Sequence, residues 1–344
     1  MRIVFLLLNI VFALLLLVST LTPWVAPSAS VWPSMLSYAC PFFIAANMFF
    51  VIVWLCFVRK EFLLSLVVLV LRFSFVTQYV QLGGTSEYEG KEVPVLKLMT
   101  FNAHGFTGRD EKMSADTGAM GFVKILREEN PDVLSLEEFF SPRHYRLLDT
   151  LKAMGYRYHY DTRSRLAGTV VFSKQPIDYV HTISGTSKMY VDIALGGRLV
   201  RFFSVHLESY RLTNDDAAEL TALNYSDTSA HNLLHKLKAT MLCHEKEWND
   251  ELKPALAQSP YPAVVAGDFN DTPASYIYQQ MSKKLNDAFV EQGKGLITTY
   301  HGPFPAYRID HVFCDTAISV LSYKCVHTDI SDHYPVVVTL SLQK

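Results

Sequence analysis

The first 80 residues contain three long apolar runs, at 3–18, 41–58 and 62–80, and Arg72 is the only charged residue inside them. The hydrocarbon core of a bilayer is about 30 Å thick and needs roughly 20 residues of helix to span it. Each run, taken with its apolar flanks, has about that length. The pattern therefore predicts three transmembrane helices, which we place at about 3–22, 38–58 and 62–80.

Positive charges give these predicted helices a direction across the membrane. Arg2 precedes the first helix, Arg59 and Lys60 separate the second from the third, and residues 23–37 contain neither Lys nor Arg. Basic residues favour the cytoplasmic side, so three spans would place residues 81–344 outside the cytoplasm. We therefore predict an integral protein of the inner or plasma membrane. The first run could instead be a cleaved signal peptide, although two further apolar runs follow at once.

The pattern changes after a polar, glycine-containing linker at 81–94, and short strands and amphipathic helices are predicted from there to the end. We expect strands at 95–101, 132–136, 156–161, 168–173, 188–195, 199–206, 262–267, 308–313, 319–324 and 335–342. We expect helices at 114–129, 142–154, 229–252 and 273–282, and a mobile loop at 207–228. This mixture predicts one α/β (α+β) domain over 95–344, in which two sheets stack and helices cover their outer faces.

Charge and cysteine content narrow the classes of function. Residues 81–344 carry 27 basic and 32 acidic side chains, so this part of the chain has a net charge of about −5. A protein that grips nucleic acid mainly through its phosphates is expected to be basic instead. The five cysteines include no CxxC motif. Cys314 and Cys325 could pair as a disulfide or remain as two buried thiols.

Chemically active side chains gather at the ends of predicted strands. Asp268 and Asn270 directly follow the apolar run at 262–267, and residues two apart in an extended segment point the same way. Other acid, amide and imidazole residues at strand ends are Asn102, His104, Glu137, Glu138, His206, Asp310, Asp332 and His333. Carboxylates that converge repel one another unless a cation lies between them. Hard oxygen ligands favour Mg²⁺ or Mn²⁺ over Zn²⁺.

Seven short motifs follow one another along the chain: 99–102 (MTFN), 132–138 (DVLSLEE), 168–173 (GTVVFS), 204–207 (SVHL), 267–270 (GDFN), 308–311 (RIDH) and 331–333 (SDH). Together, in this order, they resemble the endonuclease/exonuclease/phosphatase superfamily, which includes deoxyribonuclease I-like enzymes and sphingomyelinases. The resemblance covers about residues 95–342. It implies a four-layered α/β sandwich, with two packed mixed β-sheets flanked by helices, and metal-assisted hydrolysis of a phosphate ester.

The resemblance also implies a metal site. Glu138 matches the main metal ligand, and Asn102 and Asp332 match residues that lie near the metal. Two positions depart from the usual pattern. His104 stands where abasic-site endonucleases often have Asp, and Glu137 replaces the usual Gln, so that Glu137 could share the role of Glu138 or substitute for it. The implied cofactor is Mg²⁺ or Mn²⁺.

The remaining roles concern the water and the phosphate. By the same resemblance, Asp268 and Asn270 orient or deprotonate the attacking water and hold the phosphate. Asp310 pairs with His333, which contacts the phosphoryl oxygens, and His206 matches a phosphate-side histidine of the deoxyribonuclease and sphingomyelinase branches. Three further residues are expected to bind substrate; they are His104, Tyr300 and Arg308.

We therefore predict a membrane-anchored, divalent-metal-dependent phosphoesterase. Its partners would be the lipid bilayer, through residues 1–80, and a phosphodiester substrate, either a lipid headgroup or another small phosphodiester. A nuclease acting on nucleic acid is the alternative within the same chemistry. An alternative of a different class is a catalytically silent membrane binding module that keeps the fold.

Overall fold

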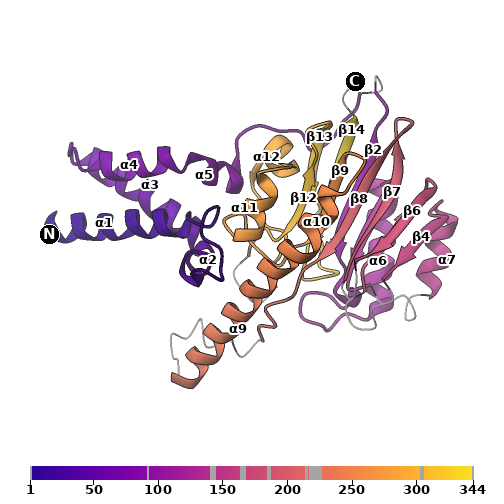
Figure 1. Ribbon diagram of the computed structural model, residues 1–344, viewed down its shortest axis with the longest axis horizontal. Helices are drawn as coiled ribbons and strands as arrows, with labels where there is room; N and C mark the ends of the chain where they lie inside the picture. The colour runs from indigo at the N-terminus through magenta and orange to yellow at the C-terminus, as the bar shows by residue number, and fades with distance from the viewer. Residues whose placement is uncertain are drawn as a thin grey trace.

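The computed structural model describes residues 2–90, 93–139, 145–162, 168–183, 187–213, 216, 227–302 and 306–342. Figure 1 shows two parts lying side by side: a bundle of N-terminal helices and a sandwich of two β-sheets built from the rest of the chain. Helices cover the outer faces of the sandwich, so the predicted four-layered α/β architecture is confirmed.

Each main sheet has six strands and mixes parallel with antiparallel pairs. The first has the order β13 (Ile318–Cys325), β14 (Val336–Leu342), β2 (Leu96–Asn102), β3 (Val133–Glu137), β5 (Val170–Ser173) and β4 (Tyr158–Asp161). The second has the order β10 (Asn286–Asp287), β12 (Asp310–Cys314), β9 (Ala263–Asp268), β8 (Arg198–His206), β7 (Lys188–Leu195) and β6 (Ile177–Thr182). A two-stranded ladder joins β1 (Val80–Gln81) to β11 (Gly295–Leu296).

The two sheets meet through the apolar side chains of their facing surfaces. Alternate residues of a strand point to opposite faces, so Leu98 of β2 and Val264 of β9 both reach the layer between the sheets. The outer face of the first sheet packs on α6 (Ala115–Glu129) and α7 (Tyr145–Ala153). The central strands are therefore buried on both faces, which explains why they read as nearly continuous apolar runs.

Helices on the second sheet complete the fourth layer. They are a π-helical turn (Glu247–Leu252), α10 (Lys253–Ala257) and α11 (Tyr276–Ser282). The long helix α9 (Asp227–Lys246) leads into the π-helical turn and contacts α11. Trp248 and Leu252 of the π-helical turn pack on this sheet. A further short helix, α12 (Ala288–Gln292), adds Phe289 to the layer between the sheets.

Local signals explain why α6 was predictable. The side chain of Ser114 caps its first turn by accepting a hydrogen bond from the backbone N–H of Thr117. The helix ends at Glu129, and the capping residue Asn130 adopts a left-handed conformation with φ of 48° before Pro131. By contrast, β6, β10, β11 and α12 are elements that we did not expect, because they are short and lack a clear period.

Three predictions fall partly on undescribed residues, and the first is the linker at 81–94, of which positions 91–92 are not described. Of the expected loop at 207–228, positions 214–215 and 217–226 lie outside the described residues, and α9 begins at 227. Of the expected helix at 142–154, positions 142–144 lie outside them. Among the cysteine alternatives, the structure has Cys314 and Cys325 as free thiols.

The N-terminal region contains five helices. Among the described residues, α1 (Arg2–Ser19) is the one helix long and apolar enough by itself to cross a membrane. The predicted span at 38–58 contains one helix, α3 (Cys40–Cys56), which α2 (Val31–Ser37) precedes at a bend of 68°. The predicted span at 62–80 is broken, because α4 (Phe62–Leu71) bends by 74° into α5 (Phe73–Tyr79). Counting each bent pair as one span would give three, so three spans remain a prediction.

A buried polar cluster joins α1, α3 and α4. Trp54 Nε1 donates a hydrogen bond to Asn9 Oδ1 over 2.9 Å, and Ser65 Oγ donates to Asn47 Oδ1 over 2.8 Å. Asn9 Nδ2 closes the cluster by donating to Ser65 Oγ. Where the surroundings are apolar, such polar bonds hold helices together because no water competes for them.

The helical bundle contacts the sandwich directly. Thr22 Oγ1 donates to the carbonyl of Ala274 over 2.7 Å, and Gln279 Nε2 donates to Gln78 Oε1 over 2.8 Å. The predicted linker at 81–94 begins as part of this contact, because Gln81 pairs with β11. These bonds anchor the bundle beside one edge of the sandwich.

Candidate active site

The strand-end residues predicted from the sequence come together because of sheet topology. β2 runs parallel to β3, and β8 runs parallel to β9, so their carboxyl ends lie at one edge. In the second sheet His206 pairs in register with Asp268. β12 runs antiparallel to β9, which places its first residue, Asp310, opposite Asp268. One edge of the sandwich therefore collects side chains from both sheets.

Gly267 permits the close approach of β9 to β8 just before Asp268. Its φ is +146°, and a Cβ added there would lie 1.8 Å from the carbonyl oxygen of Val205. Any other residue would push the strands apart at the point where His206 and Asp268 must lie next to each other.

Asn102 connects the two carboxylates of the site. Its Nδ2 donates a hydrogen bond to Asp268 Oδ2 over 2.9 Å and to Glu138 Oε1 over 3.2 Å. Glu138 adopts a φ of 50°, which is uncommon for a residue with a side chain. Burial opposes ionisation of Glu138, but hydrogen bonds and nearby histidines outweigh it and lower the pKa of its carboxyl to about 2.

Glu137 lies away from this pair. Its side chain is fully buried, and its Oε1 accepts a hydrogen bond from Ser135 Oγ over 2.7 Å. Burial is the main reason that the pKa of Glu137 is well above its ordinary value. The structure thus directs Glu138, and not its neighbour, into the cavity.

Asp310, His333 and Asp268 form a buried row. His333 Nδ1 lies 2.9 Å from Asp310 Oδ2, and His333 Nε2 lies 3.8 Å from Asp268 Oδ2. Burial would lower the pKa of His333, but the two carboxylates outweigh it and hold this pKa well above the ordinary value. The imidazole is therefore positively charged at neutral pH, with Nε2 directed at Asp268. Burial also raises the pKa of Asp268.

Two further histidines face Glu138. His104 Nδ1 lies 3.4 Å from Glu138 Oε2 and 3.7 Å from Asp332 Oδ1. Its hydrogen bond with Glu138 raises the pKa of His104. His206 Nε2 lies 3.8 Å from Glu138 Oε1, and neither ring nitrogen of this buried histidine has a hydrogen-bond partner among the described residues. A buried polar group without a partner is costly, so His206 is suited to contact a ligand.

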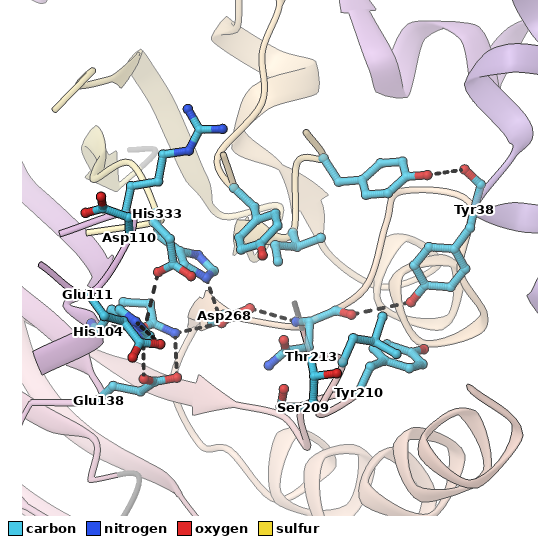
Figure 2. Close-up of a pocket in the computed structure, with 18 of the residues that line it drawn as sticks. Tyr38, His104, Asp110, Glu111, Glu138, Ser209, Tyr210, Thr213, Asp268 and His333 are labelled. Carbon is cyan, nitrogen blue, oxygen red and sulfur yellow. Dashed lines mark hydrogen bonds and ion pairs between the residues drawn. The ribbon is translucent and has the colours of Figure 1, made fainter. Parts of the chain in front are cut away.

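These side chains form the floor of a cavity of about 1080 Å³ (Figure 2). Eight of the eleven predicted site residues line it; they are Asn102, His104, Glu138, Asp268, Asn270, Tyr300, Asp332 and His333. The ring of Tyr300 packs edge-on against that of His333, with centroids 5.2 Å apart. His206 lies beside the floor, and Asp310 lies behind His333.

Arg308 does not line the cavity, contrary to our expectation for a substrate-binding residue. Its guanidinium is buried, pairs with Asp287 over 2.8 Å and donates to the carbonyl of Gln78 over 2.9 Å. Arg308 therefore holds the sandwich to the N-terminal region and supplies no charge to the cavity.

The far side of the cavity contains residues that the sequence did not indicate. Tyr38, from the bend between α2 and α3, donates a hydrogen bond to Asp271 Oδ1 and lies 3.4 Å from the carbonyl oxygen of Asn270. On the other side of Asp271, His244 Nδ1 lies 2.8 Å from Oδ2. Figure 2 shows Tyr38 and Tyr210 together across the cavity from His104 and Glu138. This chain of contacts supports the loop that carries Asn270.

The sequence profile of the Endonuclease/Exonuclease/phosphatase family matches residues 99–333. A second profile, for a domain of unknown function, matches residues 2–79. A search of curated proteins returned no match.

Solved structures show the same fold. The endonuclease/exonuclease/phosphatase from Beutenbergia cavernae is 21% identical over 72% of this chain and 72% of its own, with a TM-score of 0.51. The one from Bacteroides vulgatus is 16% identical over 72% of this chain and 99% of its own, with a TM-score of 0.53. Both crystal structures share the two-sheet sandwich with this chain.

Proposed function

The chain belongs to the endonuclease/exonuclease/phosphatase family, and from this premise we propose that it hydrolyses a phosphodiester with the help of a divalent metal ion. The observation that carries the proposal is the convergence of Glu138 and Asp268 on a single amide of Asn102, next to the charged His333. Such a set combines cation-binding oxygens with a group that can neutralise phosphate charge.

The side chains fit Mg²⁺ or Mn²⁺. Glu138 Oε2 and Asp332 Oδ1 lie 3.4 and 3.7 Å from the same nitrogen, His104 Nδ1, so carboxylate oxygens of these two residues already converge on one small region. We assign the metal to Glu138, Asn102 and Asp332, all of which offer oxygen ligands. When bound, the ion supplies charge that offsets the anionic phosphate.

Asp268, Asp310 and His333 offer three atoms within 4.8 Å of one another, which could also hold a metal. We assign this cluster to proton and phosphate chemistry instead. The Nδ1 of His333 already engages Asp310 over 2.9 Å, which leaves Nε2 as the nitrogen available to the substrate. A buried imidazolium in this position is suited to a phosphoryl oxygen.

The reaction then follows from the remaining side chains. Asp268 accepts a proton from water, and Asn270 orients that water. The water oxygen bonds to phosphorus while one ester P–O bond breaks, leaving a phosphomonoester. The departing alkoxide takes a proton from solvent to become an alcohol, and Asp268 returns its proton to solvent. His333 and His206 contact the phosphoryl oxygens, and Asp310 holds His333 in its charged form. The raised pKa of Asp268 makes its carboxylate a stronger base than a free one.

The N-terminal region is proposed to anchor the enzyme in a membrane. Large apolar side chains point outward along α1, α3 and α4; examples are Ile3, Leu7, Phe49, Ile52 and Val70. Soluble monomers rarely expose apolar surface on this scale. Arg2 and Glu61 form an ion pair, so the start of α1 and the turn before α4 lie together at the end of the bundle far from the sandwich (Figure 1). This arrangement agrees with the orientation proposed from the charges, with the catalytic domain outside the cytoplasm.

The test is hydrolysis of bis-p-nitrophenyl phosphate by the full chain in detergent, with and without Mg²⁺ or Mn²⁺. Glu138→Ala and Asp268→Ala should each abolish metal-dependent turnover. His235→Ala is the matched control, because this exposed side chain does not line the cavity. Equal turnover in all variants would contradict the proposed site. Absence of both turnover and divalent-ion binding by calorimetry would favour a silent binding module.

A further inference from the structure

The cavity extends well beyond the catalytic floor, and its far wall is apolar. A volume of about 1080 Å³ is at the upper end of the range for small-molecule sites. The floor is made of carboxylates, amides and imidazoles. The lining also includes apolar or aromatic side chains, here called the wall, and among them Tyr38 lies across the cavity from His104 and Glu138 (Figure 2); they are Met35, Tyr38, Leu212, Leu233, Leu237 and Ile309. A phosphate group alone would contact only the floor.

Two separate parts of the chain build this wall. Met35 and Tyr38 come from the N-terminal region, outside residues 99–333 that match the family. Leu233 and Leu237 are one turn apart on α9, so they lie on the same helix face. Met35 and Tyr38 therefore add to the cavity a part that lies outside the Endonuclease/Exonuclease/phosphatase match, whereas Leu233 and Leu237 lie inside it.

Tyr38 is held firmly in place. Its hydroxyl donates to Asp271, and its backbone carbonyl accepts a hydrogen bond from Tyr307 Oη over 3.1 Å. Its ring packs edge-on against the rings of Tyr210 and Tyr307, at centroid distances of 5.5 and 5.9 Å. A wall fixed in this way is preformed, which reduces the entropy lost when a ligand binds.

Charge around the cavity argues against a polyanion. Its described lining includes three cationic side chains, Arg109, Lys112 and the charged His333 of the floor, and five carboxylates, at Asp110, Glu111, Glu138, Asp268 and Asp332. Lys112 pairs with Asp110 over 2.9 Å. A nucleic-acid groove is expected to present unpaired basic residues along its length. The lining suits a single phosphate that carries an uncharged, apolar extension.

The exposed apolar surface of the N-terminal helices indicates where a substrate with such an apolar extension would come from. The wall residues Met35 and Tyr38 lie between α1 and α3, whose outward side chains form the exposed apolar surface described above. The apolar wall is thus contributed by the same region that would lie in a bilayer.

We propose that the wall formed by Met35, Tyr38, Leu233 and Leu237 is a subsite for an alkyl or acyl chain, and that the substrate is a lipid phosphodiester. This proposal rests on the phosphodiesterase function proposed above. It adds a binding role for the N-terminal region beyond anchoring.

The experiment uses p-nitrophenyl phosphodiesters whose second ester group is methyl, butyl or octyl, with the full chain in detergent and Mg²⁺ or Mn²⁺. Water attacks phosphorus and p-nitrophenol leaves, so every ester gives the same coloured product. Burying one methylene group is worth about 0.8 kcal/mol, so kcat/KM is expected to rise by up to about fourfold per methylene. Most of this rise in kcat/KM is expected to come from a lower KM, because the alkyl chain of the ester binds away from the reacting atoms.

Variants of the wall residues test where the alkyl chain of the ester binds. Leu237→Ser and Met35→Ser should each lower the octyl-to-methyl ratio of kcat/KM at least fivefold. The matched control is Leu234→Ser, because Leu234 is exposed on α9 and does not line the cavity. Its ratio should stay unchanged. Thermal unfolding of each variant verifies folding, and both substituted side chains are only partly buried.

The outcomes separate this proposal from the function on which it rests. Equal kcat/KM for all three esters, with metal-dependent turnover, would overturn the chain subsite and leave the phosphodiesterase intact. A chain-length preference unaffected by both wall variants would also overturn the subsite. No turnover of any ester would overturn the phosphodiesterase itself. Preference for an oligonucleotide over the octyl ester would instead support the nuclease alternative.

Discussion

Replacement of His244 by Ala should destabilise the folded protein and weaken the active site together. His244 is 2% exposed, with Nδ1 2.8 Å from Asp271 Oδ2 and Nε2 2.7 Å from the carbonyl oxygen of Glu208. Because both ring nitrogens face acceptors, the imidazole carries two protons and a positive charge. It forms a buried ion pair with Asp271, whose other oxygen accepts from Tyr38.

The size of the expected loss of stability follows from the burial of this ion pair. Removing one partner of a buried ion pair costs about 3–5 kcal/mol, because the remaining charge is left without compensation. In a domain of this size, each kcal/mol lowers Tm by about 2–4 °C, so we expect a loss of roughly 6–20 °C. Catalysis should fall as well, since Asp271 directly follows Asn270 and supports its loop. The expected loss in kcat/KM is about 10-fold or more, by displacement of a positioning group.

The effect should depend on pH in a defined direction. Burial lowers the pKa of His244, but the charge of Asp271 outweighs it, so the pKa in the folded state is raised. A histidine whose pKa is raised on folding stabilises the protein fully at pH values below its pKa in the unfolded state, which is about 6.5. This stabilisation is lost as the pH rises through the pKa of the histidine in the folded state. The difference in Tm between wild type and His244→Ala should therefore be largest at about pH 6 and shrink at alkaline pH.

The assay is thermal unfolding of the full chain in detergent at several pH values, with kcat/KM for bis-p-nitrophenyl phosphate measured alongside. His235→Ala, on the exposed face of the same helix, is the control and should change Tm by less than about 2 °C. The buried ion pair would be refuted if His244→Ala lowered Tm by no more than His235→Ala does. It would also be refuted if the decrease in Tm for His244→Ala did not vary with pH.

Further predictions concern the catalytic row, the metal site and the contact with the N-terminal region. Asp310→Asn removes a charge-assisted hydrogen bond of 2.9 Å, so kcat/KM should fall by roughly 10- to 150-fold. Asp310→Asn should also lower the pKa of His333, because the charge of Asp310 is the largest effect that raises it, so the alkaline limb of the pH–rate profile should move to lower pH. An alkaline limb at the same pH as in the wild type would exclude this pairing. Glu138→Gln should abolish Mg²⁺ binding by calorimetry while Glu137→Gln preserves it, and the reverse result would exchange their roles. Arg308→Met should lower the stability by about 3–5 kcal/mol in thermal unfolding without raising KM, and a raised KM in a stable variant would restore the substrate-binding role.

Most of the catalytic floor could be predicted from the sequence. Asp268 and Asn270 stand at the end of an apolar run, and their spacing alone indicated that they share a direction. The strand-end positions of Asn102, Glu138 and His333 followed from local patterns and from the family resemblance. Both signals are local in the chain, and each depends on only a few neighbouring residues.

Arg308 shows where such reasoning fails. It lies two residues before Asp310, so its position in the sequence suggested the same cavity. Its burial against Asp287 and Gln78 depends on how the N-terminal region packs on the sandwich. The sequence pattern shows that an arginine precedes a strand, but it does not show which surface that strand end faces.

The sequence by itself determined the apolar N-terminal runs, the two-sheet architecture and the residues of the catalytic floor, because periodicity and strand-end position are properties of short segments. Only the tertiary structure decided that Tyr38 completes the cavity. Tyr38 and Asp271 are 233 residues apart, and their contact requires the helical bundle to pack on the loop after β9. No local pattern specifies such a contact, because its stability comes from surfaces that are formed only when both parts have folded.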